Sequence, residues 1–502
     1  MKCKLKILIF LVIIITFSNY LYSKTMDDYK TSVSNFINRN SEEFINISRS
    51  IWSYAELGFQ EYKSSELMIK TLKKYGFKVQ KNISNIPTAF IAEWGEGSPV
   101  IGVTGEFDAL PGLSQKAGAV TKEPIIENAP GHGCGHNILG TTGLLTAITL
   151  KTVMEQNKLK GTIKFFGTPA EESGSAKVYM VRDGFMNGVD VVLDNHPGDK
   201  FAVEYGFHTN ALFYFKVTFL GKAAHAASNP WDGVSALDAF ELMAHGINLL
   251  REHLFLSHRI HYIIEEGGVA PNIVPDKVVV AIYVRDSDDK IKNTYEKVLN
   301  CVKAGALATG CNYKVELINA LHQVHINENL AKLMYKNMKK VGIPSWSNDE
   351  LEMAHELQKN FGVSQLGLAD KVELIPPPDT FIGGYSTDLG EISLVAPTAT
   401  ITVPTWPKGI PLHSWASCAM APTSIAHKGM IAAAKALAYT GIDLINKPEI
   451  LKEIKDEFEN MKKIYPYKCY LPDDNKPSLD LYKKEMERFR PQMKKFYMDK
   501  NL

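Results

Sequence analysis

The segment Thr-Ile-Lys-Phe-Phe-Gly-Thr-Pro-Ala-Glu-Glu (residues 162–172) indicates the fold class of this chain. Its first five residues are mostly apolar or β-branched, as in a strand that is buried on both faces of a sheet. Similar segments at 100–104, 189–193 and 398–403 alternate with long helical patterns such as 138–155. This alternation predicts an α/β fold with a largely parallel sheet.

A second pattern begins near residue 211 and ends near residue 325. The elements expected there are a strand at 213–220, a helix at 234–250, strands at 259–264 and 277–284, a helix at 288–306 and a strand at 313–318. The order β-α-β-β-α-β is that of a ferredoxin-like unit, which folds as a complete small domain. We therefore expect an inserted domain at 211–325 that divides the catalytic domain into two parts, 24–210 and 326–502, the second ending in a helical tail.

The first 23 residues have the pattern of an export signal. A basic start, Met-Lys-Cys-Lys-Leu-Lys, precedes an apolar run at 7–17 and then small residues. That run is shorter than the roughly 20 apolar residues that a membrane-spanning helix needs. We expect an exported protein, periplasmic or secreted, and an uncleaved N-terminal membrane anchor is the alternative.

The charge and the cysteine content argue against a nucleic-acid-binding protein and against a disulfide-stabilised fold. The formal net charge is +1, without the one-sided basic balance that nucleic-acid binding requires. Apart from Cys3 in the signal segment, five cysteines remain, an odd number at irregular spacing. This is not a disulfide framework, so at least one of them, Cys134, needs another explanation.

Side chains of the metal-ligand type follow the expected strands. A thiol and two imidazoles lie between glycines in Gly-His-Gly-Cys-Gly-His-Asn (131–137), and Glu171 and Glu172 directly follow a strand. His196 and His413 follow two more strands. Taken singly, these features fit a glycine-rich turn, an exposed acidic pair and lone core histidines. Since ligand sites in α/β sheets gather beyond the carboxyl ends of the strands, together they predict a site for a divalent metal.

The chain resembles the amidohydrolase branch of the metallo-aminoacylase and carboxypeptidase superfamily, from about residue 30 to 445. Within that branch it is similar to the subgroup acting on p-aminobenzoyl-glutamate, which shares Asn137 where most members have Asp. The matching stretches are 131–137 (Gly-His-Gly-Cys-Gly-His-Asn), 168–172 (Thr-Pro-Ala-Glu-Glu), 221–227 (Gly-Lys-Ala-Ala-His-Ala-Ala), 235–239 (Ser-Ala-Leu-Asp-Ala), 267–275 (Gly-Gly-Val-Ala-Pro-Asn-Ile-Val-Pro), 386–390 (Ser-Thr-Asp-Leu-Gly) and 411–415 (Pro-Leu-His-Ser-Trp).

The resemblance implies a pair of divalent metal ions, Mn²⁺ in the first place and Zn²⁺ as the alternative. The implied ligands are Cys134, His136, Glu172, His196 and His413. Glu171 would be the general base that takes a proton from the activated water and passes it to the leaving amine. Asp108 follows the strand at 100–104 and would either orient a ligand histidine or simply form a turn.

The resemblance also gives the inserted domain a role as lid and dimerisation domain. His225 would reach the active site of a partner subunit and donate a hydrogen bond to the oxyanion of the transition state. Asn272 would hold the substrate carboxylate with it, and Arg285 would add positive charge. The expected assembly is a homodimer, or a heterodimer with a related subunit.

The expected function is hydrolysis of the amide bond of an N-acyl or N-aroyl amino acid such as p-aminobenzoyl-glutamate, a small-molecule substrate. A dipeptidase or carboxypeptidase on the same scaffold is the first alternative. A non-catalytic subunit is the second, but all six ligand and base residues are present. A serine hydrolase is disfavoured because the chain lacks a Gly-x-Ser-x-Gly motif.

Overall fold

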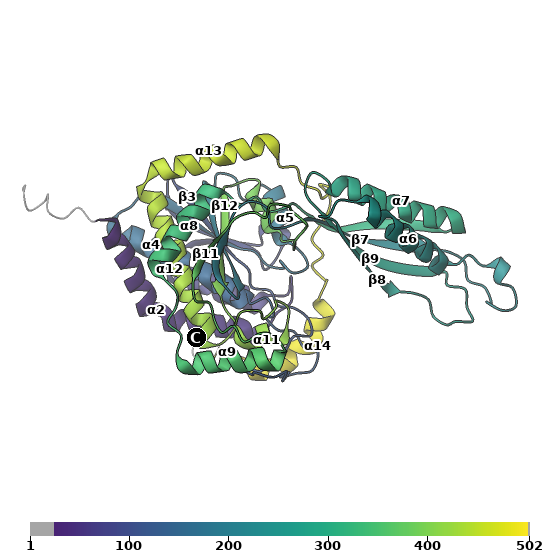
Figure 1. Cartoon of the computed structure of the whole chain (residues 1–502), viewed down its shortest axis with the longest axis horizontal. Coiled ribbons are helices and arrows are strands. Elements are labelled where there is room, and N and C mark those ends of the chain that lie inside the picture. The colour runs from purple at the N-terminus through teal and green to yellow at the C-terminus, as the bar shows by residue number, and fades with distance from the viewer. Residues whose placement is uncertain (1–24, 500–502) are drawn as a thin grey trace, which may run out of the picture.

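The computed structural model describes residues 25–499. This part of the chain forms a main domain around an eight-stranded sheet and an elongated inserted domain around a four-stranded sheet (Figure 1). The inserted domain projects from one side of the main domain, and the chain passes between the two bodies after residue 204 and again before residue 328. We propose that the domain boundaries lie in these two connections, near residues 210 and 325.

The eight-stranded sheet has the order β1-β2-β4-β3-β5-β12-β6-β11. Its four central strands, β4, β3, β5 and β12, are parallel to one another, and they correspond to the four strands expected from the apolar segments. The strands are β1 (Lys78–Lys81), β2 (Phe90–Glu96), β3 (Val100–Gly105), β4 (Gly161–Gly167), β5 (Val191–Gly198), β6 (Phe201–Glu204), β11 (Val372–Ile375) and β12 (Thr398–Pro404). The prediction of a largely parallel sheet is therefore confirmed.

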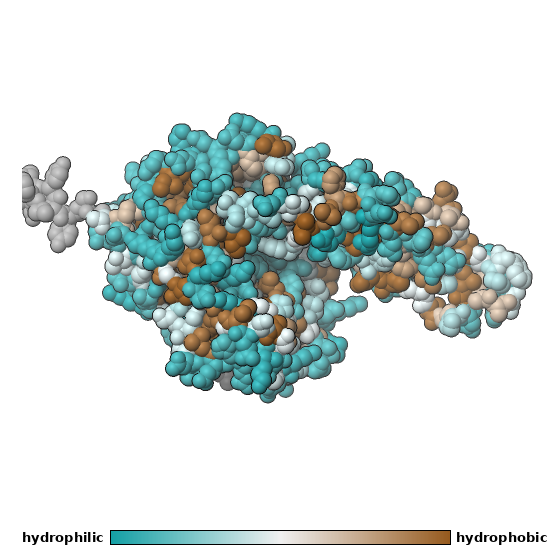
Figure 2. All heavy atoms as spheres, in the orientation of Figure 1, coloured by the Kyte–Doolittle hydropathy of each residue, from teal (hydrophilic) through white to brown (hydrophobic). Residues whose placement is uncertain are grey.

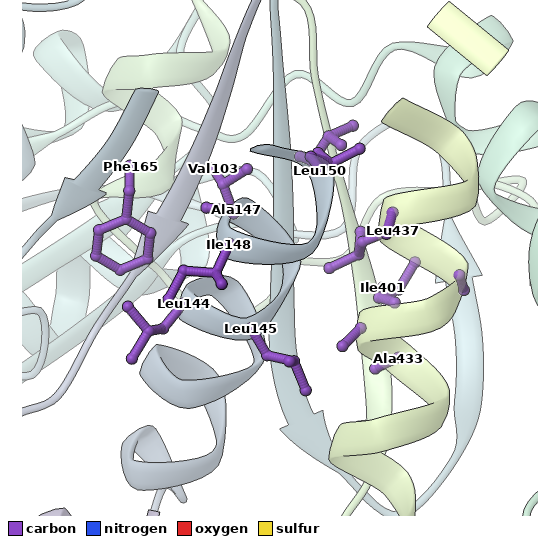
Figure 3. Close-up of a cluster of buried hydrophobic side chains, with 14 of the residues drawn as sticks. Val103, Leu144, Leu145, Ala147, Ile148, Leu150, Phe165, Ile401, Ala433 and Leu437 are labelled. Carbon is purple, nitrogen blue, oxygen red and sulfur yellow. The ribbon is translucent and has the colours of Figure 1, made fainter. Parts of the chain in front are cut away.

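Helices cover this sheet and fix the elements that carry the site. The helices of the main domain are α2 (Met26–Tyr54), α3 (Tyr62–Lys74), α4 (His136–Asn157), α5 (Ala176–Arg182), α8 (Glu328–Val341), α9 (Asn348–Phe361), α10 (Leu389–Ser393), α11 (Trp415–Met420), α12 (Ser424–Asn446), α13 (Pro448–Ile464) and α14 (Lys483–Met493). Helix α4 is buried along most of its length, because it packs against the sheet, α2 and α12. Figure 3 shows Leu144 and Ile148 of α4 beside Val103 and Phe165 of the sheet, with Leu437 of α12 in the same cluster, all of them fully buried. Burying such a side chain contributes about 1.5–3 kcal/mol, so these contacts hold α4 against the sheet.

The inserted domain has the predicted ferredoxin-like order. Its elements are β7 (Ala211–Leu220), α6 (Ala236–Leu250), β8 (Arg259–Glu266), β9 (Lys277–Asp286), α7 (Ile291–Thr309) and β10 (Asn312–Leu321). The strands pair antiparallel in the order β10-β7-β9-β8. One face of the sheet packs against α6 and α7, which leaves the other face without a helix of this domain. The fold prediction, including the insertion, is confirmed.

The expectation of export with a possible membrane anchor requires a correction. The segment that suggested it, residues 1–23, lies outside the described residues. Between residues 25 and 499 no helix is long and apolar enough to cross a membrane. The structure gives the anchor no support, and we do not retain that expectation.

Candidate metal centre

The side chains selected from the sequence meet at one edge of the eight-stranded sheet. Because β3, β4, β5 and β12 are parallel, their carboxyl ends lie together. Asp108 follows β3, Glu171 and Glu172 follow β4, His196 lies near the end of β5, His413 follows β12 after a loop, and Cys134 and His136 lie at the start of α4. Segments that are far apart in the sequence therefore build a single site.

One detail of this arrangement differs from the sequence prediction. His196 was expected to follow its strand, but β5 continues to Gly198 and His196 is part of it. The reason is pairing with the neighbouring strand: β12 stays in register with β5 beyond this point, with Thr402 opposite His196. The backbone of His196 is thus held by the sheet instead of by a loop.

Two groups of ligand atoms share the thiol of Cys134. The ligand atoms of Cys134, His136 and His196 all lie within 4.8 Å of one another, and those of Cys134, Glu172 and His413 do the same. The Cys134 sulfur is 3.5 Å from Nε2 of His196. Oε2 of Glu172 is 3.4 Å from Nε2 of His413. The candidate ligand atoms thus form two groups that have the Cys134 sulfur in common.

Buried atoms without hydrogen-bond partners support the same interpretation. Nε2 of His136 and Oε1 of Glu172 are both buried, and neither makes a hydrogen bond among the described residues, although Oε2 of Glu106 lies 3.1 Å from Nε2 of His136. A buried polar atom left unsatisfied costs about 1–3 kcal/mol, and a bound cation removes that cost. Sulfur, imidazole nitrogen and carboxylate oxygen are donors for Zn²⁺ and related divalent ions. The residues present therefore fit a pair of divalent metal ions.

Asp108 orients two of the proposed ligands. Its Oδ1 is 3.0 Å from Nδ1 of His136, and its Oδ2 accepts a hydrogen bond of 3.0 Å from the backbone N–H of Glu172. His196 is held in a similar way, since its Nδ1 is 2.9 Å from the carbonyl oxygen of Pro197. In both rings the other nitrogen, Nε2, is left to face the ligand atoms around Cys134. This geometry favours the orienting role of Asp108 over that of a simple turn residue.

The backbone has a positive φ at three positions next to the proposed ligands: His413, Ala170 and Gly135. His413 has a φ of +59°, and its N–H donates to the carbonyl of Gly133 over 3.0 Å, which ties the loop after β12 to the Cys134 segment. Ala170, just before the two glutamates, also has a φ of +59°. Gly135 has a φ of +76°, and a Cβ there would lie 2.9 Å from the Pro197 ring. Glycine is therefore required between Cys134 and the helix that begins at His136.

Three charged residues beside the centre were not selected from the sequence. The Lys177 amino group is 2.7 Å from Oε1 of Glu106 and 2.5 Å from Oδ1 of Asp388, and all three side chains are buried. The other oxygen of Glu106 is 3.1 Å from Nε2 of His136. Glu106, two residues before Asp108, and Asp388, in the matching stretch 386–390, carried a sequence signal, whereas Lys177 carried none.

Burial and neighbouring charges separate the pKa values of the two adjacent glutamates. Burial, together with the carboxylates of Glu106 and Glu172, raises the pKa of Glu171 well above its usual value. Burial also opposes ionisation of Glu172, but a hydrogen bond from His413 and the charge of His136 outweigh it and lower the pKa of Glu172 to about 2. One carboxylate therefore holds a proton readily and its neighbour stays ionised, as a base and a metal ligand should.

Asn137 has a structural role that an aspartate could not fill. It is fully buried, and its amide group donates to the Ser48 hydroxyl over 3.0 Å and to the carbonyl of Ala421 over 3.1 Å. An ionised aspartate has no proton to donate. The departure from Asp at this position therefore ties the start of α4 to α2 and to the segment after α11.

His225 and Asn272 lie together, but far from the metal cluster of the same chain. They are exposed in two loops at the distal end of the inserted sheet, where the N–H of Ala226 donates to the carbonyl of Asn272 over 3.0 Å. The ten residues of β7, at about 3.3 Å each, separate them from the main domain by roughly 30 Å. Nδ1 of His225 accepts from the N–H groups of Ala227 and Ser228, which leaves its Nε2 proton free to donate.

Comparison with known proteins agrees with the fold. Residues 102–355 match the model of peptidase family M20/M25/M40. The chain is 35% identical over 480 residues to one of the subunits of the p-aminobenzoyl-glutamate hydrolase of Escherichia coli, covering 90% of this chain and 99% of that protein. It is 30% identical over 443 residues to the Xaa-Arg dipeptidase of mouse, covering 84% and 90%.

A solved structure adds evidence on the fold. A dinuclear metal binding peptidase of the M20 family from Bacillus subtilis superposes with a TM-score of 0.55 at 17% identity, covering 82% of this chain and 99% of that one. The sheet, the insertion and the ligand cluster define a metal-dependent amidohydrolase or peptidase. With its match to the family model and its relatives, the chain belongs to peptidase family M20/M25/M40.

Proposed function

We propose that this chain hydrolyses the amide bond of an N-acyl or N-aroyl amino acid, with p-aminobenzoyl-glutamate as the first substrate to test. The observation that carries the proposal is the pair of ligand groups sharing Cys134, with a partly buried proton acceptor, Glu171, beside them. The substrate class follows from the name and extent of the Escherichia coli relative.

The residues that would hold the ions are Cys134, His136, His196, Glu172 and His413. Bound there, divalent ions of a kind still to be identified would lower the pKa of a water molecule and polarise the amide carbonyl. Glu171 would take a proton from the attacking water and deliver it to the leaving nitrogen. Asp108 keeps the His136 ring in position throughout.

Arg285 is the proposed partner of the substrate carboxylate within the same chain. Its buried Nε has no hydrogen-bond partner among residues 25–499, and no acidic side chain there forms an ion pair with it. Its guanidinium lies 5.2 Å from the centre of the Tyr283 ring. A half-buried guanidinium without an acidic partner is well suited to bind a carboxylate in two-pronged fashion.

His225 and Asn272 are proposed to act across a subunit interface. Strand β8 is an edge strand of the inserted sheet, and its Ile263 and Ile264 are 65% and 45% exposed. Figure 2 shows hydrophobic residues gathered on the inserted domain as well. An exposed apolar edge strand is a site for pairing with another chain. Dimerisation here, with a second copy or a related subunit, would carry His225 toward a partner's metal centre.

A dipeptidase is the second candidate function. The specific observation in its favour is the 30% identity to a dipeptidase over most of both chains. A non-catalytic role is disfavoured, because the six proposed ligand and base residues occur together at one edge of the sheet.

The experiment is a substrate panel on metal-loaded protein. The panel contains p-aminobenzoyl-glutamate, N-acetyl amino acids and Xaa-Arg dipeptides, assayed by release of the free amino acid with added Mn²⁺ or Zn²⁺. We expect hydrolysis of an acyl or aroyl amino acid that EDTA abolishes. Glu171→Gln should lower kcat by about 10²–10⁴-fold with unchanged metal content. Full activity of that variant would refute the role of Glu171, and activity on dipeptides alone would favour the second candidate.

A further inference from the structure

The turn after β4 carries the two adjacent glutamates, and its backbone is held on either side of Glu171. Before Glu171, the N–H of Ala170 donates to Oε1 of Glu61 over 2.8 Å. After it, the N–H of Glu172 donates to Oδ2 of Asp108 over 3.0 Å. Glu61 and Asp108 are both buried. Two buried carboxyl groups from different parts of the chain therefore fix the backbone on both sides of the proposed base.

Ala170 needs this support, because its φ of +59° is one that residues other than glycine rarely adopt. Such a conformation persists only where the surrounding structure enforces it. The carbonyl oxygen of Ala170 accepts from the N–H groups of Gly174 and Ser175 over 2.8 and 2.6 Å. Its methyl group packs closely on Gly58, where a Cβ would lie only 3.0 Å away. The hydrogen bond to Glu61 holds the one remaining polar group of Ala170, its N–H.

Glu61 lies directly before α3 and serves as a hydrogen-bond acceptor in a fully buried place. Its second oxygen, Oε2, is 2.9 Å from the hydroxyl of Thr88 in the loop before β2. Burial and the nearby Asp108 carboxylate raise the pKa of Glu61 well above its usual value. These surroundings favour the neutral acid, whose carbonyl oxygen accepts a hydrogen bond as the oxygen of an amide does.

The backbone next to Glu61 is itself anchored. Nη2 of Arg490 in α14 donates to the carbonyl of Gln60 over 2.7 Å. The amide group of Gln60 in turn donates to the carbonyl of Leu479 over 2.8 Å. Because these bonds involve the C-terminal segment and not the turn after β4, Glu61 presents its carboxyl group to Ala170 from a position that is fixed independently.

We propose that Glu61 is a positioning residue, which by accepting the hydrogen bond from Ala170 keeps the Glu171 carboxylate beside the ligand atoms of His136. The inference rests on the proposed function, in which Glu171 moves the proton. Asp108 holds the N–H of Glu172 separately, so loss of the Glu61 bond should displace the base more than the ligand. A displacement of about 1 Å in a reacting group can cost about 100-fold in rate.

The experiment separates the hydrogen bond from the charge of Glu61 in the metal-loaded full-length protein, with p-aminobenzoyl-glutamate as substrate. Glu61→Asp keeps the carboxyl group but withdraws it from Ala170 by one methylene, and kcat should fall about 10- to 100-fold with unchanged KM and metal content. Glu61→Gln keeps the length and one acceptor oxygen, and should retain kcat. Glu61→Met fills the space without a strong acceptor, so it should repeat the loss, and it replaces Glu61→Asp if that variant does not fold.

A matched control and a second measurement complete the design. Glu56→Asp shortens another fully buried glutamate, whose carboxylate accepts from the N–H groups of Lys63 and Ser64 at the start of α3; it should leave kcat unchanged. Hydrogen exchange of the peptide 168–172 in the metal-free protein reports on the turn without any turnover. The Ala170 amide should exchange slowly in the wild type and in Glu61→Gln, and faster in Glu61→Asp and Glu61→Met.

The outcomes distinguish this inference from the proposed function. Unchanged kcat in Glu61→Asp and Glu61→Met would overturn it, and so would a loss in Glu61→Gln as large as theirs, since the charge and not the bond would then matter. A similar loss in Glu56→Asp would show general loosening and overturn it too. If the wild type hydrolyses no amide, the proposed function fails, and the exchange of the Ala170 amide still decides whether Glu61 holds the turn. Faster exchange in Glu61→Asp, with wild-type exchange in Glu61→Gln, supports the inference.

Discussion

Replacing Lys177 by Met tests the buried charge cluster beside the metal centre. Lys177 and Asp388 have fully buried side chains and Glu106 is only 4% exposed, so the lysine is in direct contact with two carboxylates shielded from water. Removing one member of a buried ion pair costs about 3–5 kcal/mol, because the remaining charges have no compensation. Met fills a similar volume, so the loss measures the charge. We expect Lys177→Met to lower the free energy of unfolding by that amount.

The assay is urea unfolding of the metal-free protein at pH 8, followed by tryptophan fluorescence. Burial raises the pKa of Asp388 to about 7 even beside Lys177, so Asp388 is ionised at pH 8 and the loss should shrink at pH 6. Adding Asp388→Asn to Lys177→Met should recover part of the stability. Lys332→Met is the control: its ion pair with Glu328 is about half exposed on both sides, and its loss should stay below about 1 kcal/mol. A loss for Lys177→Met no larger than that of the control would refute the reasoning.

Three further changes test neighbouring parts of the structure. Asp108→Ala should weaken metal binding about 10- to 100-fold by calorimetry, because the His136 ring loses its orienting partner; unchanged affinity would contradict that role. Asn137→Asp should destabilise the protein by at least about 2 kcal/mol in urea, since a buried carboxylate replaces two donated hydrogen bonds. Burial and nearby Arg49 lower the pKa of His427 to about 3. Between about pH 6.5 and pH 3 the unfolded chain therefore binds a proton that the folded protein does not, and the free energy of unfolding decreases as the pH is lowered. His427→Gln should make that fall shallower by up to about 1.4 kcal/mol per pH unit, and an unchanged slope would exclude His427 as the cause.

Much of the fold was predictable because it depends on local patterns. Apolar strands buried on both faces carry a signal in any single segment, which is why the four central strands were found within a few residues of their bounds. The ferredoxin-like order followed in the same way from alternating elements. The end of β5 was misplaced, since only pairing with β12 extends that strand through His196.

The candidate site was predictable as far as its residues follow strands or match a family motif. Asp108 could not be distinguished from a turn residue, because its role depends on the position of the His136 ring, which belongs to another element. Lys177 was missed altogether, since a lysine in a short helix carries no sign that it will be buried between two carboxylates.

The amino-acid sequence by itself determined the class of fold, the insertion and the chemical types of the proposed metal ligands, because strand burial and ligand chemistry are properties of short segments. Only the tertiary structure decided that Cys134 is shared between two ligand groups and that Lys177 lies between Glu106 and Asp388. These contacts join residues tens to hundreds of positions apart. Their distances follow from how the parallel strands, the inserted sheet and the tail pack together, which no local pattern records.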